Sequence, residues 1–299
     1  MADAREETIL MCGRDFTQED LWVVKQTVRI FHKLSRKELA QTVCEHLEWV
    51  SPNGRNKVES CLELFAKLEA AGEIKLPKKQ SSERRASGGI AITTETDAPS
   101  EITGSVASVL AAVKPVFGKD DMRLWNQYVA RYHSLGYKQP FGAHQRYFIY
   151  ARNGEPLGCL LFAASAWALE MRDCWIGWTY EDRSRRLYLV VNNTRFLIFP
   201  WVRIKNLASH ALSLTAKRIR QDWQERYGYK PVLLETFVDP EKHRGTCYKA
   251  ANWTFLGETA GRGRMDRYTQ HLSSVKHIYA YPLDRDFRSI LCGESRDNR

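Results

Sequence analysis

The stretch Pro231–Arg264, PVLLETFVDPEKHRGTCYKAANWTFLGETAGRGR, is the part of this sequence that says most about the fold. An apolar run, Val232–Leu234, leads directly into an acidic residue, Glu235, as a buried strand does when it ends at a polar site. A loop with Asp239 follows, and then a short segment with Cys247 and Tyr248. Polar and reactive groups at the end of a buried strand are typical of binding and catalytic sites, so we place the candidate site here.

Composition and charge limit the possible functions of the 299-residue chain. It is 43% apolar and 27% charged, as is usual for a folded protein of one or two domains. Its net charge of +10 attracts polyanions, and we expect DNA or another nucleic acid as the partner, with a charge that serves only solubility as the alternative. The seven cysteines form no C-x-x-C pair, and their odd number, without a signal peptide, indicates the cytoplasm. No apolar run is long enough to span a bilayer, so we expect no membrane partner.

Residues 1–80 predict a winged helix-turn-helix domain. Apolar residues recur at helical spacing after Thr17, after Ser35 and from Val58 onward, and both Thr17 and Ser35 begin a capping signal. Glu73–Pro77 is then expected to be the strand of the wing. Arg55, Asn56 and Lys57 stand at the start of the third helix, where recognition helices contact bases and phosphates. A three-helix unit that binds a protein, or that has only a structural role, is the alternative.

A polar, Ser-, Thr- and Arg-rich segment, residues 81–104, reads as a flexible linker. Residues 105–299 then alternate between strand and helix patterns. Asn153-Gly154 marks a hairpin, a long helix is expected over about 207–226, and Ile278–Tyr281 is expected to be the last strand. This order predicts a mixed α/β domain.

Three carboxylates are candidate metal ligands. Glu235 and Asp239 lie four residues apart, and the fold could bring Asp173 near them, giving the oxygen ligands that Mg²⁺ prefers. A metal here would support a nuclease or DNA strand transferase. The alternative is that Glu235 pairs with an arginine such as Arg244, while Asp239 caps the next turn.

Other side chains are candidates for proton transfer or nucleophilic attack. Tyr248 could donate a proton or attack a DNA phosphate, or it could simply pack against Trp253. Cys247 would need a base such as His133 or His243, and a buried structural thiol is the alternative. Farther along, Arg262 and Arg264 alternate with Gly261 and Gly263, and Arg267 lies behind them, a pattern that suits phosphate binding as well as a solvated hairpin.

The order of elements in residues 105–299 resembles the GNAT-type acetyltransferase fold. That superfamily holds the pyrophosphate of coenzyme A in a Q/R-x-x-G-x-G/A loop, and Arg203-Ile204-Lys205-Asn206-Leu207-Ala208 is similar except that Asn206 replaces the first glycine. Asn tolerates a left-handed backbone, so the loop could still form, although its side chain would crowd a pyrophosphate. The resemblance also implies a catalytic role for Tyr248 as a general acid. Coenzyme A is therefore the weaker cofactor candidate beside Mg²⁺.

Blocks along nearly the whole chain resemble the DruA family of Druantia anti-phage systems. They include Gly13–Phe16, Arg131–Tyr137, Trp175–Trp178, Val191–Leu197 and Glu235–Pro240. The resemblance implies a role in phage defence or in a mobile element, with other proteins of such systems as partners. We therefore expect a DNA-binding protein acting on nucleic acid. A metal-dependent nuclease or strand transferase, a GNAT-type acyltransferase and a non-catalytic recruiting module are the alternatives.

Overall fold

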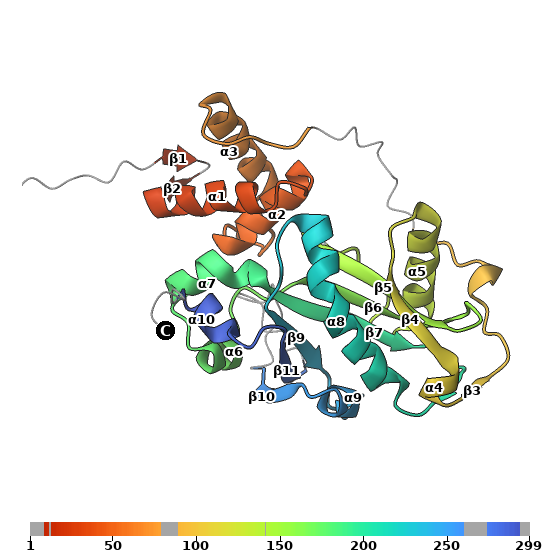
Figure 1. Ribbon diagram of the computed structural model, residues 1–299. Helices are drawn as coiled ribbons and strands as arrows, with labels where there is room; N and C mark the ends of the chain where they lie inside the picture. The colour runs from red at the N-terminus through yellow and green to blue at the C-terminus, as the bar shows by residue number, and fades with distance from the viewer. Residues whose placement is uncertain (1–8, 12, 79–88, 141, 260–273, 294–299) are drawn as a thin grey trace, which may run out of the picture.

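A computed structural model describes residues 9–11, 13–78, 89–140, 142–259 and 274–293 (Figure 1). A helical N-terminal unit lies against a larger C-terminal domain that is built on a seven-stranded sheet. The mixed α/β fold predicted from the sequence is confirmed.

The N-terminal unit consists of a short hairpin, β1 (Ile9–Met11) and β2 (Arg14–Phe16), and three helices. The helices are α1 (Gln18–Ile30), α2 (Arg36–His46) and α3 (Val58–Ala70). Both predicted capping boxes form, Thr17 with Asp20 and Ser35 with Glu38, so the orphan N–H groups at these helix starts have side-chain partners.

The wing is not formed where the sequence predicted it. Glu73–Pro77 has no strand pairing within the described residues. Instead, the connection between α2 and α3 folds back on itself through an isolated antiparallel bridge between Val50 and Asn56. Backbone bonds from Ser51 N to Arg55 O (2.8 Å) and from Lys57 N to Trp49 O (3.1 Å) extend this α2–α3 turn, residues 49–57. The local backbone hydrogen bonds are therefore found in the connection between α2 and α3, and not in a strand after α3.

The second half of the expected linker packs on the C-terminal domain. It contains the one-turn helix η1 (Thr94–Thr96) and strand β3 (Ile102–Gly104), which pairs in parallel with β8 (Val202–Ile204). Arg131 binds Asp97 at 2.6 Å, and the Tyr132 hydroxyl donates to the carbonyl of Thr96 at 2.7 Å. Residues 94–104 therefore belong structurally to the domain that follows them.

The central sheet has the strand order β10-β11-β9-β7-β6-β5-β4, and all pairs are antiparallel except β7–β9. Its strands are β4 (Leu110–Pro115), β5 (His144–Ala151), β6 (Pro156–Ala164), β7 (Val190–Ile198), β9 (Leu233–Val238), β10 (Thr254–Glu258) and β11 (His277–Pro282). The sheet is therefore mixed, with its one parallel pair near the centre.

Helices cover both faces of the sheet (Figure 1). They are α4 (Val106–Val109), α5 (Lys119–Tyr132), α6 (Glu170–Ile176), α7 (Tyr180–Arg186), α8 (Leu207–Tyr227), α9 (Thr246–Ala250) and α10 (Phe287–Leu291), with the one-turn helix η2 (Leu187–Leu189). Tyr128 of α5 packs on Phe148, while Asp222 of α8 accepts a hydrogen bond from Tyr147. Adjacent strand residues point to opposite faces, so α5 and α8 cover opposite faces of the sheet. None of the described helices is long and apolar enough to cross a membrane.

A β-bulge in β7 changes the faces that its side chains meet. Leu161 pairs with Arg195 and Phe162 with Asn193, which leaves Thr194 as an extra residue. The Asn193 amide holds the bulge by donating to the carbonyls of Leu161 (3.1 Å) and Arg195 (3.0 Å). Because of this extra residue, Asn193 and Arg195 point to opposite faces although they lie two positions apart.

Candidate functional site

Glu235 lies in the middle of β9 and is fully buried. Its carboxylate accepts hydrogen bonds from Arg172 Nη1 at 3.0 Å and from the backbone N–H of Ala166 at 3.2 Å. Arg172 is fully buried as well, and it also binds Asp173 at 2.7 Å. The guanidinium of Arg172 therefore lies between the two carboxylates, Glu235 and Asp173, that the sequence suggested as metal ligands.

Asp173 accepts further hydrogen bonds from its neighbours. Arg183 Nη1 and the indole N–H of Trp178 donate to Asp173 at 2.8 and 3.0 Å. Asp239 accepts instead from the backbone N–H of Glu241 at 3.1 Å, within its own turn. No group of three potential ligands that could hold a metal occurs in the described part of the chain. The Mg²⁺ site stays a prediction, and the side chains as placed do not fit one, because a guanidinium already neutralises the carboxylates.

The parallel strands β7 and β9 separate at the position where the sequence placed its reactive residues. Only Val190–Asn193 of β7 pair with Leu233–Thr236 of β9, and both strands continue beyond these residues. The Tyr248 hydroxyl, from α9, donates to Asn193 Oδ1 at 2.7 Å. Burial raises the pKa of Tyr248 above its usual range, so this hydroxyl keeps its proton at neutral pH.

The neighbours of Tyr248 fit the packing interpretation better than the catalytic one. Its ring lies 5.1 Å from that of Trp253, edge to face. Thr236 Oγ1 donates to the carbonyl of Asn193 at 3.0 Å and so closes the same network. Burial raises the pKa of Cys247 to about 11, which leaves the thiol protonated and a weak nucleophile at neutral pH.

His133 follows α5 and is partly buried. Burial, with the nearby charges of Arg195 and His243, lowers the pKa of His133 to about 4. Its Nδ1 accepts the backbone N–H of Leu135 at 3.1 Å, which assigns the proton of the neutral ring to Nε2. His133 therefore offers a hydrogen-bond donor, whereas the sequence interpretation assigned it the role of a base.

The loop Arg203–Ala208, which resembles a coenzyme A loop, forms although Asn206 stands in place of a glycine. Asn206 adopts the left-handed conformation (φ 65°) immediately before α8, as expected of a residue that stands in for glycine. Its carbonyl accepts from the N–H of His210 at 3.1 Å, but its side chain makes no capping bond. Arg203 and Lys205 are exposed, Leu207 is buried and Ala208 is partly buried. The loop exists, and what it binds stays a prediction.

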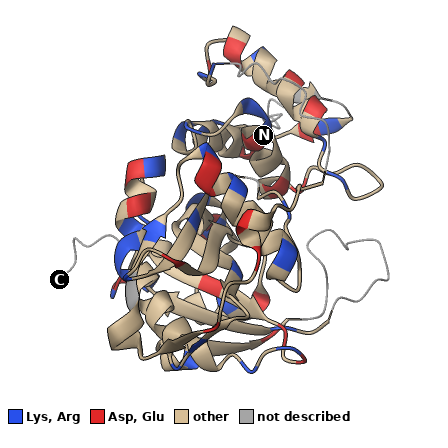
Figure 2. Cartoon of the chain, turned by 90° about the vertical axis from the view of Figure 1, so that its right-hand side faces the viewer, with Lys and Arg blue, Asp and Glu red and all other residues tan. Residues whose placement is uncertain are grey.

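The proposed nucleic-acid contacts lie in the α2–α3 turn, before the first turn of α3. Arg55 is exposed, and Asn56 is fixed by the backbone bridge to Val50 and by a bond from its amide to the carbonyl of Gln41 (3.4 Å). Lys57 is the N-terminal boundary residue of α3. Arg262, Arg264 and Arg267 lie outside the described residues. Elsewhere, Lys and Arg positions are interspersed with Asp and Glu positions (Figure 2), and the last turn of α7 carries Arg183, Arg185 and Arg186.

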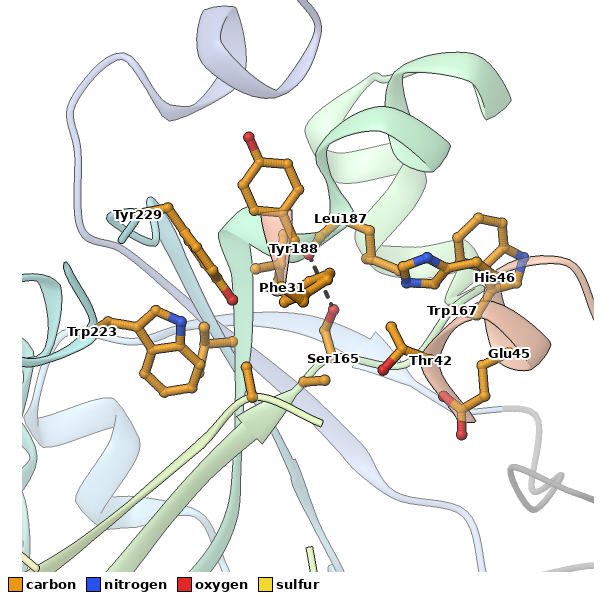
Figure 3. A pocket seen from close by; sticks show the side chains of 14 residues that line it. Phe31, Thr42, Glu45, His46, Ser165, Trp167, Leu187, Tyr188, Trp223 and Tyr229 are labelled. Atoms are coloured by element: carbon orange, nitrogen blue, oxygen red, sulfur yellow. Dashed lines mark hydrogen bonds between the residues drawn. The ribbon is translucent and has the colours of Figure 1, made fainter. Parts of the chain in front are cut away.

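A small cavity between the two units was not foreseen from the sequence (Figure 3). It has a volume of about 30 Å³, enough for one or two water molecules. Phe31 meets Tyr229 edge to face at 5.8 Å, and His46 lies 5.2 Å from the ring of Trp167. Side chains from α2, the end of α1 and the C-terminal domain together line it, so the N-terminal unit is packed on the sheet domain by aromatic contacts. Such contacts join residues far apart in sequence and give no local signal.

The sequence interpretation also missed Arg146 and Arg195. Arg146 ends the polar start of β5, His144–Arg146, and Arg195 ends the polar stretch Asn192–Arg195 of β7; Arg146 is only 4% exposed. An arginine directly before an apolar run in a strand of the sheet was the available signal, because burial of an arginine requires a partner.

The fold places the chain among mixed α/β proteins, with a seven-stranded sheet and an N-terminal helical unit. The sequence matches the family described as Druantia protein DruA over residues 67–274, and the chain belongs to this family. No curated protein matches the sequence.

Several solved acetyltransferases are similar in fold. Spermidine N-acetyltransferase from Vibrio cholerae has 8% identity and a TM-score of 0.39, covering 59% of this chain and 96% of its own. An N-acetyltransferase from Staphylococcus aureus has 13% identity and a TM-score of 0.34, covering 57% and 96%. A probable GNAT-family acetyltransferase from Chromobacterium violaceum has 14% identity and a TM-score of 0.35, covering 70% and 98%.

Proposed function

We propose that this chain is a DNA-binding protein of anti-phage defence and that its N-terminal unit contacts the DNA. Membership of the DruA family supports the defence role, and the net charge of +10 supports a polyanionic partner. The observation that carries the proposal is the α2–α3 turn, which presents Arg55 to solvent beside Lys57 at the start of α3. In helix-turn-helix proteins the N-terminal residues of the second helix of such a pair contact the DNA, and Arg and Lys side chains bind its phosphates.

The test is the affinity of the full chain for a labelled DNA duplex, measured by fluorescence anisotropy over a series of salt concentrations. Replacing both Arg55 and Lys57 by Gln is expected to weaken binding and to lower the salt slope by about 2, one for each lost phosphate contact. The matched control, Arg152→Gln with Lys217→Gln, removes the same charge from exposed positions of the C-terminal domain and is expected to keep the slope. Equal slopes in the two double variants contradict the proposal.

Acyl-coenzyme A binding is a second candidate, favoured by the separation of β7 from β9 and by the left-handed Asn206 at the start of α8. Backbone N–H groups at a helix start suit a pyrophosphate. Against it, the hydroxyl of Tyr248 is already bound to Asn193 and offers no free proton. Calorimetry with coenzyme A decides: no heat at millimolar ligand excludes this candidate. The nuclease alternative gains no support from the arrangement of Glu235 and Asp173 around Arg172.

A further inference from the structure

Two arginines on the α5 face of the sheet are buried or partly buried without an acidic partner. Arg146 on β5 and Arg195 on β7 both pair with Leu161 of the intervening strand, so they point to the same face. No described carboxylate lies within ion-pair distance of either. By contrast, the fully buried Arg172 has two carboxylates, Glu235 and Asp173.

Both guanidinium groups reach the loop that follows α5. Arg195 Nε donates to the carbonyl of Gly136 at 3.1 Å, and Arg146 Nη2 lies 3.4 Å from the hydroxyl of the next residue, Tyr137. Arg146 also lies over the ring of Trp125 at 5.3 Å, and its buried Nε has no hydrogen-bond partner. Arg195 Nη1 also donates to the carbonyl of Thr194 at 2.7 Å. Both guanidinium groups therefore contact one short loop, and Arg146 Nε is a buried donor without a partner.

Such an arrangement is costly in the absence of an anion. Burial lowers the pKa of both guanidinium groups, because it removes water from around their charged forms. A buried charge without a partner is strongly unfavourable, and residues of this kind gather where a ligand supplies the opposite charge. His133 adds a neutral Nε2–H donor beside Arg195.

We propose that Arg146, Arg195 and His133 bind a phosphoryl group of a ligand beneath the loop after α5. A phosphoryl group fits better than a carboxylate because it can carry two negative charges and offers three oxygens to separate donors. The proposal is independent of DNA binding by the N-terminal unit, since none of its residues lies in the α2–α3 turn.

The experiment measures binding to the full chain by calorimetry and thermal shift at constant ionic strength. The probes are inorganic phosphate, adenosine monophosphate against adenosine, and a short DNA strand with and without a 5′-phosphate. Inorganic phosphate is expected to bind, and in each of the two matched pairs the phosphorylated probe is expected to bind at least roughly ten-fold more tightly, as a charge-assisted hydrogen bond allows. The pair that shows the larger difference identifies the source of the phosphate.

Arg195→Gln is expected to remove this preference, while Arg152→Gln, an exposed arginine at the turn between β5 and β6, keeps it. Arg195→Lys keeps the charge but loses the planar guanidinium, and it is expected to bind the phosphorylated probes with intermediate affinity. It also serves as a control for a folding defect in Arg195→Gln. Without ligand, Arg146→Met is expected to be at least as stable as the parent, because it removes an unpaired buried charge.

Three results overturn the proposal. One is equal binding of phosphorylated and unphosphorylated probes. Another is an equal loss of affinity in Arg195→Gln and Arg152→Gln. The third is marked destabilisation of ligand-free Arg146→Met, which would mean that Arg146 serves the fold alone.

Discussion

Replacing Glu235 by Gln distinguishes a structural carboxylate from a metal ligand. The change keeps the size of the side chain and removes its charge. It leaves Arg172, which is fully buried, with Asp173 as its remaining acid. Breaking one partner of a buried ion pair typically costs about 3–5 kcal/mol of folding free energy, because the other charge stays buried.

The structure places the expected cost within that range. Glu235 is 0% exposed and accepts two hydrogen bonds, from Arg172 at 3.0 Å and from Ala166 at 3.2 Å. Asp173 still neutralises part of the guanidinium charge, so we expect a loss of about 3 kcal/mol, near the lower limit for a broken buried pair. Urea unfolding followed by circular dichroism measures it, and Glu155→Gln on an exposed turn is the control, expected within about 0.5 kcal/mol of the parent.

A double variant shows whether the loss belongs to the pair. Glu235→Leu combined with Arg172→Met replaces both charges by apolar groups and is expected to be more stable than either single variant. Added Mg²⁺ is expected to leave the unfolding midpoint of the parent unchanged. A loss below about 1 kcal/mol in Glu235→Gln, or an Mg²⁺-dependent rise in the parent that this variant abolishes, refutes the reasoning.

Four further predictions follow from individual side chains. His144 is buried, and burial lowers its pKa to about 4, whereas the ordinary pKa in the unfolded state is about 6.5. The unfolded state therefore binds a proton that the folded state does not, and folding stability falls as pH falls from about 6.5 to 4, by about 2 kcal/mol between pH 7 and 5. His144→Asn is expected to reduce this loss, measured by urea unfolding at the two pH values. Tyr248→Phe removes the donor to Asn193 and is expected to cost about 1–3 kcal/mol in the same assay, with an unchanged stability arguing against the buried hydrogen bond. The Cys247 thiol, with its pKa raised to about 11, is expected to react with iodoacetamide at pH 8 far more slowly than the exposed Cys174, as peptide mass spectrometry would show; a faster Cys247 would indicate an activated thiolate. Phe31→Ala opens the aromatic contacts with Tyr188 and Tyr229 and is expected to cost about 3–5 kcal/mol, whereas a small cost would mean that the two units are not held together there.

Much of the fold could be predicted because its signals are local. The capping residues Thr17 and Ser35 mark the starts of α1 and α2, and the Asn153-Gly154 pair marks the turn between β5 and β6. The long apolar periodicity from Leu207 gives α8 almost to the residue. Each of these depends on a few neighbouring side chains, so one sequence suffices.

The missing wing and the partner of Glu235 depend on contacts between distant residues. Glu73–Pro77 has the alternation of a strand, but no described strand lies beside it to complete the pairing. Glu235 does bind an arginine, as one interpretation held, yet the arginine is Arg172, which is 63 positions earlier and is positioned by α6. The sequence offered Arg244 because it was near, and nearness along the chain does not determine which buried charges meet.

The bulge at Thr194 explains why the arginine cluster was not seen. Strict alternation along β7 would put Asn193 and Arg195 on one face, together with Tyr248. The extra residue instead sends Arg195 to the loop after α5, where Arg146 also points. A bulge depends on the pairing with β6 and is not visible in β7 alone.

The central claim, that the N-terminal unit contacts DNA, is tested most directly by amide hydrogen exchange of the full chain with and without a DNA duplex. Increased protection of residues 49–57 and of the first turn of α3, without a comparable change at exposed positions of the C-terminal domain, is the predicted result. Protection that leaves the α2–α3 turn unchanged while DNA is demonstrably bound would contradict the account.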